Sequence, residues 1–164
     1  MVLNKKKLLL LSLLQMTLVT SVSYGKTANG IAAEQAGVSI SITGEETISA
    51  SGETDTNGVL ASSGGKVTIT GPSVTVKSDS LLGSTRSTAM GLNANGTNSE
   101  ITILGVVDIA VNAGKNARGI YVQNGGVIRV GDMSDRTDKT KITVISHEGQ
   151  VAHGITASSA GSSV

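Results

Sequence analysis

The sequence contains two histidines, His147 and His153, and no cysteine. Histidine is the usual general base near neutral pH and a common metal ligand. His147 is followed by Glu148, a pair that could begin a metal site, but no second ligand stands at helical or strand spacing from it. His153 occupies the variable position of a repeated tripeptide, which favours a solvent-facing residue. The histidines therefore give only a weak signal for catalysis.

Other catalytic arrangements leave equally weak traces. Serines are plentiful and a Ser/His/Asp triad is recognised by geometry, so the sequence leaves a triad open, but it contains no Gly-x-Ser-x-Gly motif. Polysaccharide-cleaving enzymes need clustered carboxylates in a cleft, and Asp108 is the only acidic residue in the centre of a predicted strand. We predict no catalytic residue, no cofactor site and no metal site.

The elements that would position any site belong to a repeat. Its frame is a small residue, a variable residue, Gly, an aliphatic residue, any residue, and then Ala or Val. The five framing glycines are 28, 33, 28 and 35 residues apart: Gly30, Gly58, Gly91, Gly119 and Gly154. Self-similarity of this period is typical of a solenoid. We expect coils that start near residues 28, 56, 89, 117 and 152.

Apolar and polar residues alternate after each frame with a period of two, as in strands with one buried face. The alternation covers residues 38–42, 66–70 and 100–103, and then 73–76 and 107–111. Three short strands per repeat leave no room for a crossover helix, so successive repeats must pair strand on strand. The sequence predicts an all-β protein, a right-handed parallel β-helix of about four and a half coils.

Equivalent apolar residues should stack in three lines inside this core. The first line is Ile31, Val59, Leu92, Ile120 and Ile155. It is accompanied by the small residues Ala33, Ala61, Ala94, Val122 and Ala157. The second line is Ile42, Ile69, Ile103 and Val130. The third line is Ile48, Val74, Ile109 and Ile142. The polar residues expected to face solvent are Ser39, Thr68, Thr102, Arg129 and Thr143.

Glycines should form the bends of each coil. A positive φ at the bend into the first strand is the predicted reason for each framing glycine. Gly64-Gly65, Asn95-Gly96 and Gly125-Gly126 are predicted to form the corner between the first and second strands. Gly71-Pro72 should turn the second strand into the third, because Pro fits where no ladder donor is needed.

The first 25 residues have the three-part plan of a secretory signal peptide. A basic start is followed by a mostly apolar stretch, Leu8 to Val22, and small residues precede a cleavage site ahead of Lys26. The apolar stretch is interrupted by polar residues and is shorter than the ~20 residues of a membrane-spanning helix. We therefore predict a signal peptide, residues 1–25, and an exported repeat domain, residues 26–164.

The composition excludes several classes of function. From Lys26 onward there are ten Lys and Arg (13 in total minus Lys5, Lys6 and Lys7) against twelve Asp and Glu, a net charge of −2. Without Phe or Trp, and with no basic patch, the chain has no platform for nucleic acid. The absence of cysteine excludes disulfides and thiolate metal sites. Two enlarged corners, residues 77–88 and 131–141, are candidate binding loops, although a tolerated surface insertion is the favoured interpretation of each.

The leader, the lack of cysteine and the recurring Ala-x-Gly-[Ile/Val/Leu]-x-Ala frame resemble the passenger domain of bacterial autotransporters, the type V secretion family that includes pertactin-like adhesins. The resemblance covers residues 26–164 in pattern. It implies a surface destination, with passage through an outer-membrane translocator, which is absent from this sequence. Adhesion, autoaggregation or biofilm formation are the activities that such passengers commonly have.

Val164 stands ten residues after Gly154, at the first inward position of a second strand, so we expect an incomplete passenger that stops inside a coil. An open last coil should favour self-association. We expect a non-enzymatic adhesive rod at the cell surface, in the outer membrane or outside the cell, or in the periplasm if the translocator is missing. Its partners would be molecules of host or neighbouring cells. The alternative is a fragment of a β-helix enzyme acting on polysaccharide or protein.

Overall fold

The computed structural model describes residues 20–22, 27–80, 87–131, 140–148 and 151–164. These residues form strands and connections with no helix, which confirms the predicted all-β class. The strands are β1 Thr20–Val22, β2 Thr27–Ala33, β3 Ser39–Thr43, β4 Glu46–Gly52, β5 Asp55–Ser62, β6 Lys66–Ser80, β7 Thr88–Asn95, β8 Glu100–Ala113, β9 Asn116–Gln123, β10 Val127–Val130, β11 Thr140–Ser146 and β12 Val151–Ser158.

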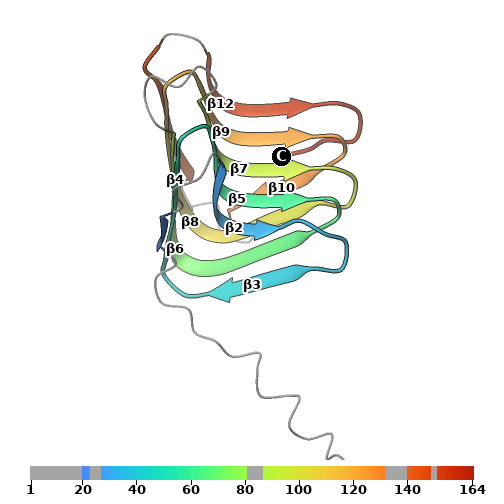
Figure 1. Cartoon of the computed structure of the whole chain (residues 1–164). Coiled ribbons are helices and arrows are strands. Elements are labelled where there is room, and N and C mark those ends of the chain that lie inside the picture. Colours follow the sequence, from blue (N-terminus) through green and yellow to red (C-terminus); the bar gives the residue numbers. More distant parts are fainter. Residues whose placement is uncertain (1–19, 23–26, 81–86, 132–139, 149–150) are drawn as a thin grey trace, which may run out of the picture.

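The strands form two sheets in which every pairing is parallel. One sheet has five strands in the order β12-β9-β7-β5-β2, and all five carry the repeated glycine frame. The other has seven strands in the order β1-β4-β6-β8-β10, with β3 beside β6 and β11 beside β8. The chain alternates between the sheets, so that equivalent strands of successive repeats lie side by side (Figure 1).

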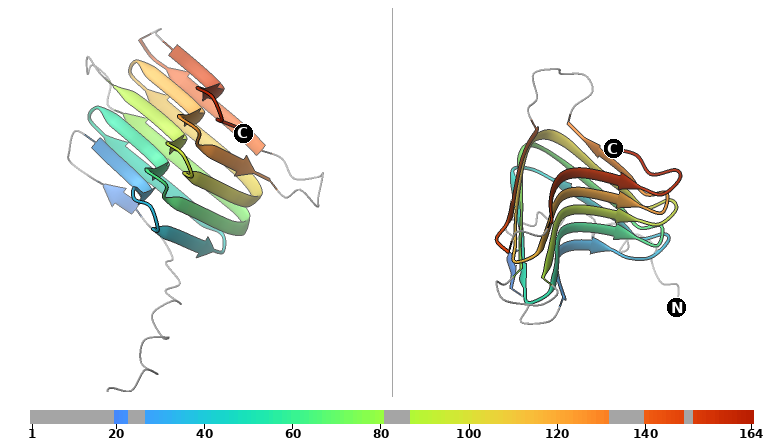
Figure 2. Two further views of the ribbon diagram at one scale, coloured as in Figure 1. Left: turned by 90° about the vertical axis from the view of Figure 1, so that its right-hand side faces the viewer. Right: turned by 90° about the horizontal axis from the view of Figure 1, so that it is seen from above.

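Seen from above, both sheets bend (Figure 2). The predicted second and third strands of a repeat are separate in the first repeat, as β3 and β4, but continuous in the next two, as β6 and β8. Gly71 and Pro72 therefore do not separate two strands as predicted. They lie inside β6, where its register against β8 shifts between Thr70 and Ser73. Such a shift lets a paired strand bend without interrupting its ladder.

Two of the three predicted core lines are confirmed by the register. Ile31, Val59, Leu92, Ile120 and Ile155 are successive partners across the five-stranded sheet. Ile42, Ile69, Ile103 and Val130 are successive partners in the other sheet. The predicted polar residues lie on the outer face: Ser39, Arg129 and Thr143 are exposed, and Thr68 and Thr102 are partly exposed.

The third predicted line is wrong at one residue. Ile48 pairs with Val76, not with Val74, and the line continues from Val76 to Ile109 and Ile142. Val74 and Val76 are both fully buried, so alternation alone does not distinguish them. The irregularity inside β6 adds one residue to this strand, because Val76 follows Ile69 by seven positions and Ile109 follows Ile103 by six.

The shift also moves Ser78 into the interior. Ser78 pairs with Ala50 on one side and Val111 on the other, and it is fully buried. Its hydroxyl donates a hydrogen bond of 2.9 Å to Thr56 Oγ1, which is buried as well. Ser78 and Thr56 therefore form a hydrogen-bonded polar pair among the aliphatic side chains of the interior.

The framing glycines do not have the predicted positive φ. Positive φ occurs at the predicted corners instead, at Gly64 (85°), Gly96 (103°) and Gly125 (80°). The framing glycines lie within strands, and Gly30, Gly58, Gly91 and Gly119 lack space for a side chain. A Cβ on Gly58 would stand 2.7 Å from the carbonyl oxygen of Gly91, and one on Gly91 would stand 2.6 Å from that of Gly119. Close approach of neighbouring backbones, not a special dihedral angle, explains why the frame requires glycine.

Most of the predicted signal peptide lies outside the described residues. Its described part, Thr20–Val22, forms β1 and pairs with Ser49–Ser51 of β4. Cleavage ahead of Lys26 would remove β1 and expose this edge of β4.

Candidate functional site

The five-stranded sheet bends at its framing glycines, and side chains three positions apart meet across the bend. In a straight strand such residues point to opposite faces. Here the Arg118 guanidinium lies 4.3 Å from the centre of the Tyr121 ring, and Thr156 Oγ1 lies 3.2 Å from His153 Nδ1. The position before each glycine and the position two after it therefore lie on the same, concave side of the bend; Figure 2 shows the bent strands from above.

We call this face the elbow. Strand register assigns to it one pair from each strand of the five-stranded sheet. The pairs, from β2 to β12, are Asn29 and Ala32, Asn57 and Leu60, Met90 and Asn93, Arg118 and Tyr121, and His153 and Thr156. The elbow thus combines amides, one cation, one aromatic ring and one histidine, and contains no carboxylate.

A row of hydrogen-bonded amides crosses the lower part of the elbow. The Asn57 amide donates to Asn29 Oδ1 at 2.8 Å, and the Asn93 amide donates to Asn57 Oδ1 at 2.9 Å. Asn57 and Asn93 are only 5% and 6% exposed although they lie on the outer face of the sheet. Asparagine ladders of this kind support parallel stacking because each amide is both donor and acceptor.

Arg118 and Tyr121 occupy the next level of the elbow. The Tyr121 hydroxyl donates to Gln123 Oε1 at 2.9 Å, and the ring holds the guanidinium by a cation–π contact. No ion pair joins Arg118 to any carboxylate in the part of the chain that the structure describes. Arg118 Nε and Asn93 Oδ1 are buried and have no hydrogen-bond partner. The elbow therefore contains one unsatisfied donor and one unsatisfied acceptor.

The two histidines lie in different surroundings. His153 is exposed and pairs in register with Arg118, as its place in the frame predicts. His147 follows β11, is also exposed, and its Nε2 lies 2.6 Å from Asn112 Oδ1. Across the described ranges, no three His, Asp or Glu side chains gather as a metal site.

Asp79 of β6 has a carboxyl group with a shifted pKa. Burial raises its pKa above the ordinary value, and a hydrogen bond with Asn112 and the charge of Lys77 oppose this shift. Asn112 therefore lies between Asp79 and His147.

The two predicted binding loops are only partly described. Residues 81–86 and 132–139, with Leu81 and Leu82 among them, lie outside the described residues. The flanking parts of both predicted loops belong to strands: Lys77–Ser80 to β6, and Thr140 and Lys141 to β11. Lys141 Nζ lies 3.7 Å from Asp108 Oδ2 on the outer face. The described flanks are therefore scaffold, and binding by the loops stays a prediction.

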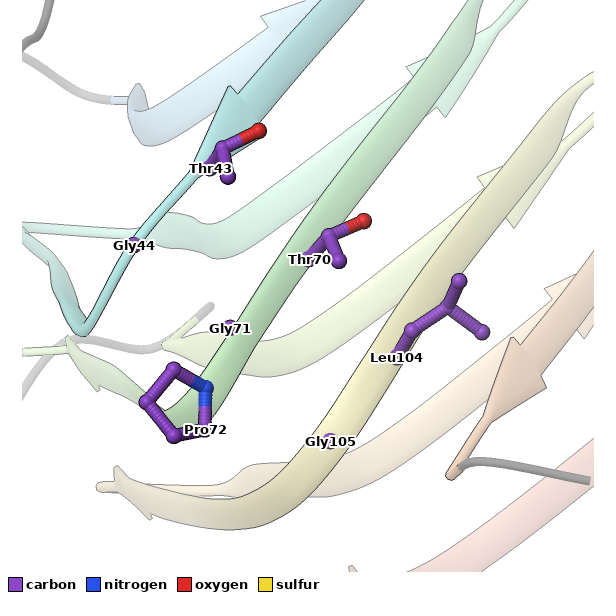
Figure 3. A pocket seen from close by; sticks show the side chains of 7 residues that line it. All are labelled: Thr43, Gly44, Thr70, Gly71, Pro72, Leu104 and Gly105. Atoms are coloured by element: carbon purple, nitrogen blue, oxygen red, sulfur yellow. The ribbon is translucent and has the colours of Figure 1, made fainter. Parts of the chain in front are cut away.

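A shallow depression lies where the seven-stranded sheet bends (Figure 3). It is lined mostly by apolar atoms of Thr43, Gly44, Thr70, Gly71, Pro72, Leu104 and Gly105. Two threonine hydroxyls are its only polar side-chain groups, and none of its residues titrates. This depression is therefore a contact surface without a titratable group.

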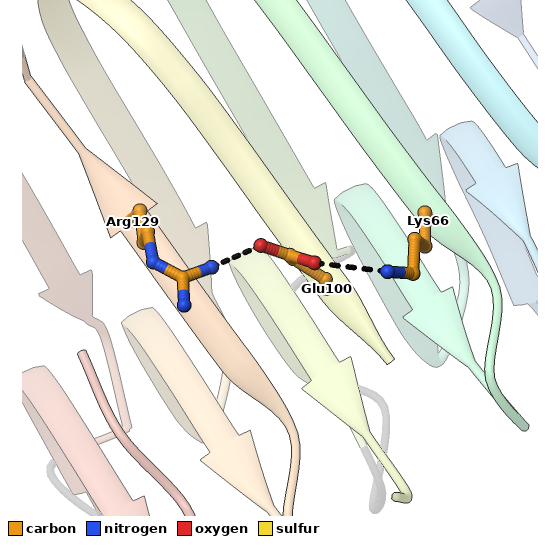
Figure 4. A network of polar contacts seen from close by, with 3 residues as sticks. All are labelled: Lys66, Glu100 and Arg129. Carbon is orange, nitrogen blue, oxygen red and sulfur yellow. Dashed lines mark hydrogen bonds and ion pairs between the residues drawn. The ribbon is translucent and has the colours of Figure 1, made fainter. Parts of the chain in front are cut away.

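The outer face of the same sheet carries a short charge network (Figure 4). Glu100 lies between two cations, with Lys66 Nζ at 3.3 Å from one carboxylate oxygen and Arg129 paired with the other. The Lys66 and Arg129 side chains are more than half exposed, so the ion pairs add little stability. The network connects β6, β8 and β10 and leaves Glu100 engaged on both sides.

The sequence predicted no site residue, and the elbow was missed. One signal was present: an asparagine fills the variable place of the frame in the first two repeats, as Asn29 and Asn57. The bend itself could not be foreseen, because strict alternation places residues 118 and 121 on opposite faces.

Comparison with protein-family models, curated proteins and solved structures finds no match to this chain. In the described part of the chain, no helix has the length and hydropathy needed to span a lipid bilayer.

Proposed function

We propose that this chain is a right-handed parallel β-helix that acts as an exported, non-enzymatic, adhesive rod. The observation that carries the proposal is the unbroken parallel register from β2 to β12, in which each repeat adds one strand to the five-stranded sheet. Such a stack grows along one axis and presents a repeated outer face, which suits an extended binding surface. The autotransporter passenger resemblance remains part of this proposal, on the basis of the leader and the frame.

The placement of carboxylates favours binding over catalysis. Glu100 and Asp108, the two acidic residues of β8, face solvent and pair with Lys66, Arg129 and Lys141. The elbow, where polar groups converge, contains no carboxylate. Cleavage of a polysaccharide by acid–base catalysis needs two carboxyl groups flanking one bond. The enzyme-fragment alternative would therefore need carboxyl groups outside the elbow.

A fractionation experiment tests export. The chain is expressed with a C-terminal tag, and the mature protein is expected in the periplasm, outer membrane or medium, with Lys26 as its first residue. Arg substitutions at Leu10 and Leu13 should hold the protein in the cytoplasm, because a signal peptide needs an apolar centre. Uncleaved protein in the cytoplasm of unmodified cells would contradict the proposal.

An adhesion assay tests the function itself. Beads coated with residues 26–164 should bind to cells more strongly than beads coated with the heat-unfolded protein, because binding depends on the folded surface. Equal retention of the two kinds of bead would exclude an adhesive role for this fold.

Self-association is a separate proposal, supported by the β12 end of the stack. β12 pairs with β9 along one edge, and no described strand pairs with its other edge. Ile155 of β12 is 58% exposed and Val164 is 53% exposed. Open strand edges with exposed aliphatic side chains favour addition of another chain. Sedimentation should show concentration-dependent assembly that Ile155→Lys reduces, and a monomer at all concentrations would contradict it.

A further inference from the structure

We propose that the elbow is a binding site for an oligosaccharide. This inference rests on the adhesive function proposed above and names the class of molecule that the rod would recognise. It starts from the bend at the framing glycines, which brings two outer rows of side chains from the five-stranded sheet into one concave face.

The chemistry of the elbow matches hydroxyl groups. Asn93 Oδ1 is an acceptor without a donor, and Arg118 Nε is a donor without an acceptor. A hydroxyl group both donates and accepts, so sugar hydroxyls can satisfy each of these atoms. Asn93 is 6% exposed, so its carbonyl oxygen lies in a largely desolvated place, where a hydrogen bond counts most.

Arg118 is the cation of the elbow. Its side chain is partly exposed, and its guanidinium rests on the Tyr121 ring at 4.3 Å from the ring centre. Both unsatisfied atoms are buried, so a ligand reaches them only when neighbouring side chains move. The ring limits the positions that the guanidinium adopts, which reduces the entropy lost on binding.

The positive charge of the elbow affects whether it binds neutral or acidic sugars. Arg118 has no carboxylate partner among the described residues, and His153 is its neighbour in register on β12. A neutral sugar uses the hydroxyl contacts alone. A uronic acid adds a carboxylate that Arg118 can bind with two parallel N–H groups.

The repeat spacing favours a chain over a single sugar. Equivalent elbow positions on neighbouring strands are ~4.8 Å apart, so the levels of Asn57, Met90, Arg118 and His153 span roughly 14 Å. A short oligosaccharide can extend across several levels, with Tyr121 and Arg118 in the middle.

The test is calorimetric titration of the full chain with two probes, maltohexaose as a neutral oligosaccharide and hexagalacturonate as an acidic one. Arg118→Gln and Tyr121→Ala should each weaken binding about tenfold or more. Arg129→Gln, the same change on the outer face of the other sheet, should alter the affinity less than about twofold. Arg118→Lys keeps the charge and should lose most of the affinity, because it lacks the planar fork.

Thermal unfolding of each variant shows whether it is folded. If Arg118→Gln fails to fold, Arg118→Lys and Tyr121→Phe take its place, with loss expected for the first and little change for the second. Binding of either probe that depends on Arg118 and Tyr121 supports the proposal, and stronger binding of hexagalacturonate assigns the acidic group to Arg118. The proposal is overturned if neither probe binds at millimolar concentration. It is also overturned if Arg118→Gln and Arg129→Gln weaken binding equally.

The bead assay separates this inference from the proposed function. If beads coated with Arg118→Gln adhere to cells as well as unmodified beads do, the rod is adhesive and the elbow is not its site. If unmodified beads do not adhere although the titration shows binding, the elbow stands and the adhesive role fails.

Discussion

Ile120 and Ile155 occupy the same position of the repeat, yet their surroundings differ completely. They are partners in register on β9 and β12. Ile120 lies between two strands and is 1% exposed, whereas Ile155 lies on the last strand of the sheet and is 58% exposed. The difference shows that burial in this fold is supplied by the next repeat along the axis and not by the residue's own strand.

The framing glycines show the same contrast. A Cβ on Gly119 would stand 2.6 Å from the carbonyl oxygen of Gly154, but one on Gly154 would meet nothing within 4 Å. A glycine is therefore sterically required in the middle of the stack and not required at the β12 end. The same motif therefore requires glycine for stability only where another strand lies beside it.

The largest expected effect comes from placing a charge at the two isoleucine positions. Ile120→Asp would bury a carboxylate without a partner and should lower the free energy of unfolding by more than about 4 kcal/mol. Ile155→Asp leaves its carboxylate in water and should cost less than about 1 kcal/mol. Urea unfolding followed by circular dichroism measures both. Comparable losses would mean that β12 is covered in solution.

The glycine pair gives the next largest effect. Gly119→Ala pushes a methyl group against the Gly154 carbonyl and the Ile142 side chain, and overpacking of this kind should cost about 3 kcal/mol. Gly154→Ala has open space and should be neutral or slightly stabilising, since alanine reduces the freedom of the unfolded chain. The same unfolding measurements apply. A harmless Gly119→Ala would show that the strands can move apart.

Much of the scaffold could be predicted from the sequence because its rules are local. Alternation identified the strands, and the period of the frame aligned Ile31 with Val59 and Leu92 correctly. Val74 was misplaced because a one-residue irregularity inside β6 is invisible to a pattern whose period is two. The elbow was missed for a related reason: contact between Arg118 and Tyr121 depends on a bend that alternation does not encode.

The amide row gives a smaller contrast along the elbow. Asn57 is hydrogen-bonded to Asn29 on one side and Asn93 on the other. Asn57→Ala should cost about 1–3 kcal/mol, because it removes two hydrogen bonds and leaves the buried Asn93 amide without its acceptor. Thr156→Ala removes only an exposed contact with His153 and should cost less than about 0.5 kcal/mol. An equal cost in thermal unfolding would refute a stabilising role for the row.

The smallest expected effect concerns charges on the outer face. Glu100 lies on a middle strand between Lys66 and Arg129, and its side chain is 27% exposed. Asp108 faces a single cation, Lys141, and its side chain is 45% exposed. Glu100→Gln should therefore cost up to about 1 kcal/mol and Asp108→Asn less, because exposed ion pairs are weak and a second partner adds to the first.

Salt should distinguish this electrostatic cost from a packing cost. The Debye length falls from about 10 Å at 0.1 M ionic strength to about 3 Å at 1 M. The destabilisation by Glu100→Gln should therefore shrink at high NaCl, whereas that caused by Gly119→Ala should persist. A Glu100→Gln effect that is unchanged by salt would mean that Glu100 acts through packing, so that the outer face, like the core, depends on the neighbouring strands for contact and not for charge.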